Sequence, residues 1–135
     1  MNKMMLVGAA LMAALSPGAS GALAADAAAG KEVFKECMAC HTVEQGKNRV
    51  GPSLHGVVGR KAASVDNFKY SKPMQEKAES GLTWTPDTLK QYLQAPKEVV
   101  PGTTMAYAGL RNSAKFKANP DVAAENLIAY LEENK

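Results

Sequence analysis

The only two cysteines of the chain stand three positions apart, at Cys37 and Cys40, and a histidine follows directly at His41. This Cys-Met-Ala-Cys-His order is the attachment pattern of c-type haem, in which each thiol forms a thioether with a vinyl group of the porphyrin. Two intervening residues on a helical turn direct both sulfur atoms toward one porphyrin edge. We therefore predict one covalently attached haem c, with Cys37 and Cys40 as its anchors and His41 as an axial iron ligand.

Other uses of a Cys-x-x-Cys pair fit this chain less well. A thioredoxin-like redox pair belongs to a βαβ unit, and no such pattern surrounds these cysteines. Half of a zinc site would need two more ligands, but only one other histidine is present. A plain structural disulfide remains open as an alternative in an exported protein.

The second axial position of the iron has four candidates outside the first 25 residues, namely Met38, Met74, Met105 and His55. Met38 lies inside the attachment loop, His55 is better explained as a structural histidine in a turn, and Met74 as a packing residue. Met105 lies in residues 101–109, where proline, glycines and small side chains allow the backbone to pass close to a ring. A gap-filling core methionine is the alternative for Met105. We favour ligation, and a thioether ligand predicts a raised reduction potential.

Three helices are predicted to position these groups, over residues 27–38, 86–95 and 120–133, and a weaker helical patch lies at 73–79. In contrast, residues 42–70 show no sustained period, which is unusual in a compact domain unless the segment wraps a ligand. No run of alternating strands is present, so the predicted fold class is all-α.

Helix ends and one helix face can also be predicted. Gly30 shares a face of the first helix with Val33, Phe34 and Cys37, and a glycine there indicates a close contact with another helix. Thr85 and Asn119 are the expected N-caps of the two later helices, because each is followed by a proline at the first helical position.

Composition limits the class of protein. The 135 residues are a one-domain length, and 16 basic against 13 acidic residues argue against a nucleic-acid-binding domain. Two cysteines exclude a scaffold with several disulfides. From residue 26 onward, Leu, Ile, Val and Phe make up 20 of 110 residues, about 18%, which is a thin core. We therefore expect a bound group to help fill the interior.

The first 25 residues predict a secretory signal peptide. Lys3 is their only charge, residues 4–15 are apolar, and small residues precede a cleavage site after Ala24 or Ala25. A membrane anchor is disfavoured because twelve helical residues rise only about 18 Å, against about 30 Å for a bilayer core. We expect a mature domain over 26–135 that does not span a membrane and is exported to the bacterial periplasm.

Beyond the haem motif, residues 27–133 resemble the class I cytochromes c, especially the mitochondrial cytochrome c and bacterial cytochrome c2 and c550 group. The motifs that carry the resemblance are Gly51-Pro52-Ser53-Leu54-His55-Gly56 with Gly59-Arg60-Lys61, Gly81-Leu82-Thr83-Trp84, Tyr92-Leu93 with Ala95-Pro96-Lys97, residues 101–109, and Asn126-Leu127-Ile128-Ala129-Tyr130-Leu131. The resemblance implies the cytochrome c fold, in which three main helices, a short one and long loops surround a covalently bound haem.

The resemblance also implies roles for single residues. The Pro52 carbonyl would orient the His41 imidazole, and Tyr92 would be the aromatic residue near Met105. Gly30 and Phe34 would face Leu127 and Tyr130 of the last helix. The groups that would bind the buried haem propionates are Arg60, Tyr70, Trp84 and Thr103. Glu36, Glu98 and Thr104 depart from the mitochondrial pattern, because lysines usually occupy these positions.

The function implied is a soluble, periplasmic, monohaem electron carrier that cycles between Fe(II) and Fe(III) and is not an enzyme. It would be a monomer that docks transiently with redox partners of a respiratory or photosynthetic chain. Such partners include a cytochrome bc1-type donor and an oxidase, reductase or reaction-centre acceptor. The alternative is a haem-based ligand-binding or sensor protein, or a weak peroxidase, with an exchangeable sixth ligand. Met105 argues against this alternative.

Overall fold

The computed structural model describes residues 25–135, so all but the last residue of the predicted signal peptide lies outside the described part. The helices are α1 (Ala27–Phe34), α2 (Lys72–Glu79), α3 (Pro86–Gln94), α4 (Pro96–Val99) and α5 (Pro120–Glu132), with a 3₁₀ helix, η1 (Leu110–Asn112), before α5. Within the described residues, β-pairing is limited to one isolated bridge between Lys61 and Thr83. The all-α prediction is confirmed.

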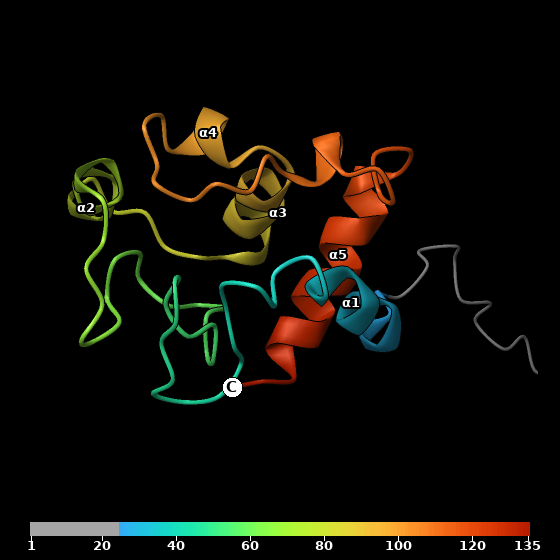
Figure 1. Cartoon of the computed structure of the whole chain (residues 1–135), viewed down its shortest axis with the longest axis horizontal. Helices are drawn as coiled ribbons and strands as arrows, with labels where there is room; N and C mark the ends of the chain where they lie inside the picture. The colour runs from blue at the N-terminus through green and yellow to red at the C-terminus, as the bar shows by residue number, and fades with distance from the viewer. Residues whose placement is uncertain (1–24) are drawn as a thin grey trace, which may run out of the picture.

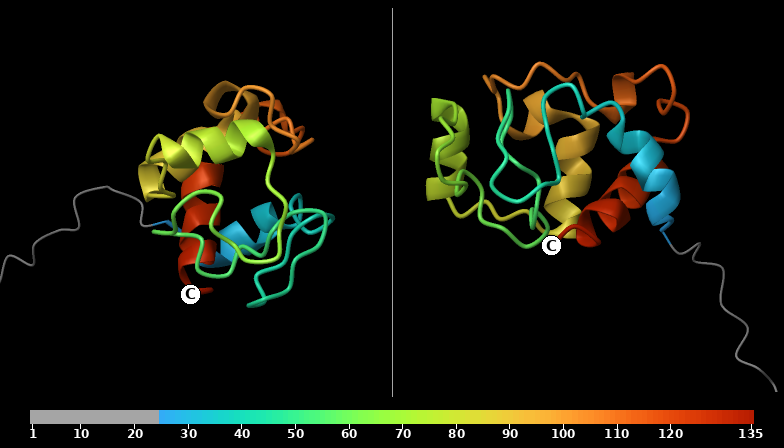
Figure 2. Two further views of the ribbon diagram at one scale, coloured as in Figure 1. Left: turned by 90° about the vertical axis from the view of Figure 1, so that its left-hand side faces the viewer. Right: turned by 60° about the horizontal axis from the view of Figure 1, so that its bottom comes forward.

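Helices α1 and α5 cross in close contact, and both Figure 1 and Figure 2 show this crossing. Gly30 is buried at the crossing, where a Cβ atom would overlap the backbone carbonyl of Asn126. Beside it, the rings of Phe34 and Tyr130 lie 5.3 Å apart between centroids. The predicted helix contact at Gly30 is confirmed, and it follows from the missing side chain, which allows the two backbones to approach.

The first helix ends earlier than the sequence predicts. It stops at Phe34 rather than at residue 38, because the following amides bond three rather than four residues back. The Glu36 amide donates to Val33 and the Cys37 amide to Phe34, which tightens the chain into successive turns. At the other end, Asp26 caps α1 by accepting hydrogen bonds from the amides of Ala28 and Ala29.

The capping predictions are half correct. Thr85 caps α3 and forms a reciprocal capping box with Thr88, as its position before Pro86 predicts. Asn119 precedes α5, but its side chain makes no capping hydrogen bond. Its ψ of 66° differs from the extended value of 163° at Thr85, so the side chain is not directed at the first-turn amides.

The long segment between α1 and α2 contains turns but no helix, as predicted for residues 42–70. In Figure 1 this segment (cyan to green) fills the lower side of the molecule, while residues 100–109 (orange) run along the upper side. The buried core includes Leu127 and Leu131 of α5 with Leu89 and Tyr92 of α3.

No helix among residues 25–135 combines the length and the apolar character that crossing a membrane requires.

Candidate haem-binding site

The two cysteines lie on a helical turn that directly follows α1. The amides of Cys40 and His41 both donate to the Cys37 carbonyl, at 3.1 and 2.9 Å. Both thiols are half-buried, and the structure shows no disulfide between them. Burial raises the pKa of Cys37 to about 12, which is the opposite of the lowered pKa that a thioredoxin-like nucleophile needs.

His41 is held with one ring nitrogen engaged. Its Nδ1 lies 2.8 Å from the carbonyl oxygen of Pro52, which is the contact that the resemblance implies. A proton on Nδ1 in this hydrogen bond leaves the lone pair of Nε2 for a metal. Burial lowers the pKa of His41, the hydrogen bond to Pro52 opposes this shift, and the positive charge of Arg60 adds to it; the net lowering favours the neutral ring that ligation requires.

Gly51 is a site residue to which the sequence reasoning assigned no role. A Cβ atom at this position would overlap the His41 ring. The glycine therefore allows the imidazole to lie flat against the backbone and keep its bond to the Pro52 carbonyl. The Gly51-Pro52 pair, which begins ten positions after His41, was visible in the sequence, but nothing local in the sequence says which ring the glycine faces.

Met105 is half-buried in the segment 100–109, between α4 and η1. Its amide donates to the Thr103 hydroxyl at 3.2 Å, and the Tyr92 hydroxyl donates to its sulfur at 3.3 Å. Burial raises the pKa of Tyr92, so this hydroxyl remains a donor. The ring of Tyr92 packs against Trp84, with centroids 4.8 Å apart.

The other three sixth-ligand candidates lie in different surroundings. The Nδ1 of His55 lies 3.2 Å from the Val43 carbonyl, which agrees with a structural histidine in a turn. Met74 is buried on α2 and belongs to the hydrophobic core. Met38 is 52% exposed within the attachment turn.

Arg60 provides the test of whether these residues fit a haem. Its Nη1 donates to the carbonyls of Ser53 and His55, both at 3.0 Å. Its Nε is buried without a hydrogen-bond partner, the one such side-chain atom in the described residues. An unpaired guanidinium nitrogen is costly in an interior, and a carboxylate oxygen of a propionate would satisfy it. The donor set therefore fits the group that the attachment motif predicts.

The remaining predicted propionate partners have mixed surroundings. Trp84 is buried at 6% exposure, as expected for a residue lining an apolar pocket. The hydroxyl oxygen of Tyr70 accepts the Val65 amide at 3.1 Å, which leaves its own proton free to donate. The hydroxyl of Thr103 accepts the Met105 amide, so its observed contact is with the candidate ligand's own backbone.

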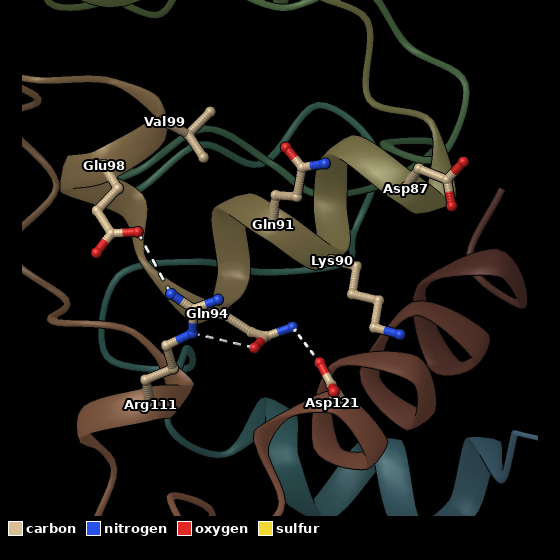
Figure 3. A pocket seen from close by; sticks show the side chains of 8 residues that line it. All are labelled: Asp87, Lys90, Gln91, Gln94, Glu98, Val99, Arg111 and Asp121. Atoms are coloured by element: carbon tan, nitrogen blue, oxygen red, sulfur yellow. Dashed lines mark hydrogen bonds and ion pairs between the residues drawn. The ribbon is translucent and has the colours of Figure 1, made fainter.

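A hollow on another surface contains none of these predicted residues. Figure 3 shows the polar chain that crosses it: the Gln94 amide donates to Asp121 at 2.8 Å and accepts from Arg111 at 3.3 Å, and Arg111 also contacts Glu98 at 3.3 Å. These contacts join η1 to α3, α4 and α5. The network fixes the end of the segment that carries Met105.

Comparison with known proteins agrees with this geometry. The family model of cytochrome c matches residues 27–135. Cytochrome c2 iso-2 of Magnetospirillum fulvum is 55% identical over 98 residues, which are 73% of this chain and 91% of that protein. Cytochrome c2 of Agrobacterium tumefaciens is 42% identical over 107 residues, 78% of this chain and 89% of that protein.

A solved structure extends the similarity to three dimensions. Cytochrome cH from Methylobacterium extorquens superimposes with a TM-score of 0.68 at 42% identity, covering 80% of this chain and 98% of that chain. Sequence motifs, helical fold and structural neighbour thus agree over nearly the whole described region. The chain belongs to the cytochrome c family and carries one covalently attached haem c.

Proposed function

We propose that this protein carries electrons in the bacterial periplasm, with its haem iron held between His41 and Met105. Membership of the family makes it a monohaem electron carrier rather than an enzyme. The observation that carries the axial assignment is that each candidate ligand is already held by a second group. Pro52 accepts from the His41 ring at 2.8 Å, and Tyr92 donates to the Met105 sulfur at 3.3 Å.

The protein's own groups divide the work of electron transfer. The bound haem supplies a reversible one-electron couple at its iron. Cys37 and Cys40 anchor the ring, and Pro52 keeps the imidazole in one orientation. Arg60 offers a buried donor to a propionate, with Tyr70, Trp84 and Thr103 as the further proposed propionate partners. Ligands fixed in this way move little between redox states, which suits rapid transfer.

The surface around the attachment turn supports transient docking. Met38 and Val50 are exposed there at 52% and 77%, and the Arg49 guanidinium holds the Met38 carbonyl at 2.9 Å. Nearby lysines are neutralised locally, since Lys35 pairs with Glu32 and Lys47 with Glu44. Exposed apolar side chains beside paired lysines favour a weak, transient complex.

The location and partners are inferred from different observations. The predicted signal peptide over 1–25 and the bacterial sources of the relatives support a periplasmic site of action. The proposed partners are a cytochrome bc1-type donor and an oxidase, reductase or reaction-centre acceptor. The proposed state between encounters is a monomer.

The axial assignment is tested on the purified, oxidised holoprotein. The near-infrared spectrum should contain the weak charge-transfer band of methionine sulfur bound to ferric haem. Met105→Ala should abolish this band and lower the reduction potential, because a thioether favours ferrous iron. Met74→Leu is the matched control, since it changes a buried methionine on α2 and should leave both readouts unchanged. A wild-type protein without the band would favour a ligand-binding or peroxidase protein with an open iron.

A further inference from the structure

Glu36 has an unusual environment for a carboxylate. It directly precedes Cys37 and is half-buried. The Ser113 hydroxyl donates to it at 2.7 Å and lies 3.0 Å from its second oxygen, and the Tyr107 hydroxyl donates at 3.4 Å. None of the ion pairs among residues 25–135 includes Glu36. The side-chain hydrogen bonds that Glu36 accepts here therefore come from hydroxyl groups, and hydrogen bonds to an ionised acceptor are the strong kind.

The two residues that donate these hydrogen bonds lie far from Glu36 along the chain. Tyr107 and Ser113 stand 71 and 77 positions after Glu36. Tyr107 follows Met105 by two residues, and Ser113 is itself buried at 6% exposure just after η1. One carboxylate thus joins the turn that carries both haem anchors to the segment that carries the candidate sixth ligand.

The same segment is fixed independently to the helices on its other side. Gly109 has a φ of 100°, and a Cβ atom there would overlap the Gln94 carbonyl, so the backbone rests directly on the end of α3. Arg111 adds contacts to Gln94 and Glu98. Those contacts fix the end of the segment against α3 and α4. The hydrogen bonds to Glu36 fix the segment relative to the attachment turn.

We propose that Glu36 is a positioning residue for Met105, acting through Ser113 and Tyr107 to keep the thioether within reach of an iron anchored at Cys37 and Cys40. The inference rests on the proposed His41 and Met105 ligation. Without the Glu36 contact, the Met105 segment keeps its contacts with α3 and Tyr92 but loses its hydrogen bonds to the attachment turn, and an external ligand displaces the sulfur more easily.

Imidazole is the probe for this displacement, because it competes with a methionine for ferric iron. Losing one hydrogen bond to a charged group corresponds to about a tenfold change in an equilibrium constant. Ser113→Ala and Glu36→Ala should therefore each bind imidazole about tenfold more tightly than the wild type, with matching loss of the near-infrared band. Glu36→Gln retains an acceptor for Ser113 and should restore affinity toward the wild-type value.

A double-variant cycle tests whether the two residues act as one contact. The Glu36→Ala/Ser113→Ala protein should bind imidazole no more tightly than the stronger single variant, because the same contact is lost in all three. Glu32→Gln removes a carboxylate of α1 whose ion-pair partner is Lys35, and should match the wild type. Ile128→Val weakens the core of α5 without touching the contact, and separates general destabilisation from loss of positioning.

The outcomes separate the two proposals. If the wild type shows the band and all variants bind imidazole with wild-type affinity, the positioning role of Glu36 is wrong and the axial assignment stands. The positioning role also fails if Ile128→Val raises the affinity as much as Ser113→Ala does, or if the effects of the two single variants add in the double variant. If the wild type lacks the band, both the axial assignment and the role of Glu36 fall.

Discussion

Gly30→Ala is expected to destabilise the protein although alanine is the better helix former. Propensity alone favours the variant by about 1 kcal/mol inside a helix. The structure opposes this gain, because the new methyl group would overlap the Asn126 carbonyl and crowd the Cβ of Tyr130. A backbone carbonyl within α5 cannot rotate away, so the helices must separate. Overpacking of this kind costs about 1–3 kcal/mol, and a disturbed aromatic pair about 0.5–1.5 kcal/mol more.

The net expectation for Gly30→Ala is a loss of about 1–3 kcal/mol in the free energy of unfolding. Guanidinium unfolding of the oxidised holoprotein should show a lower midpoint at unchanged slope. Ala28→Gly is the matched control, because Ala28 is exposed on the same helix and reports propensity alone, with a cost of up to about 1 kcal/mol. A Gly30→Ala protein as stable as the wild type, or more stable, would refute the close contact between α1 and α5.

Two further predictions concern the site. Gly51→Ala should push the His41 ring away from its Pro52 contact and lower the denaturation midpoint of the holoprotein, whereas an unchanged midpoint would mean that the ring does not lie against this backbone. A chain with Cys37→Ala and Cys40→Ala cannot anchor haem covalently. Because its content of large apolar residues is low, its circular dichroism without haem should be that of a largely unfolded chain. A cooperatively folded, helical apoprotein would contradict the view that haem is needed to complete the core.

The sequence predicted most of the architecture because its signals are local. Thr85 before Pro86 predicts the start of α3, and the glycine at position 30 predicts the crossing of α1 and α5. The end of α1 was predicted too late because periodicity continues through Cys37, while the backbone has already tightened into turns. Asn119 has the residue type of a cap, but its backbone angles follow from how the preceding turn joins α5.

The site also contains residues that local sequence predicts and contacts that it does not. Cys37, Cys40 and His41 are recognisable because their chemistry depends on spacing within five residues. The contact of Glu36 with Ser113 spans 77 positions, and the sequence around neither residue predicts that the two side chains meet. Glu36 stood out only as a departure from the mitochondrial pattern. Long-range contacts of this kind are set by how the loops are arranged, and that arrangement is visible only once the chain is folded.

The glycine at position 109 also limits how this segment can vary in length. Its backbone rests on the Gln94 carbonyl and the Pro96 ring, so the chain cannot slide through this point to absorb an extra residue. An insertion or deletion within residues 100–108 must therefore displace Met105 itself. Residues 114–119 follow Gly109 and Ser113, the two residues at which the segment is held. They are mostly exposed, so an insertion there would not move the ligand. The length of the chain is therefore fixed before Gly109 and can vary after Ser113. A chimaera between relatives of this protein should be joined within residues 114–119.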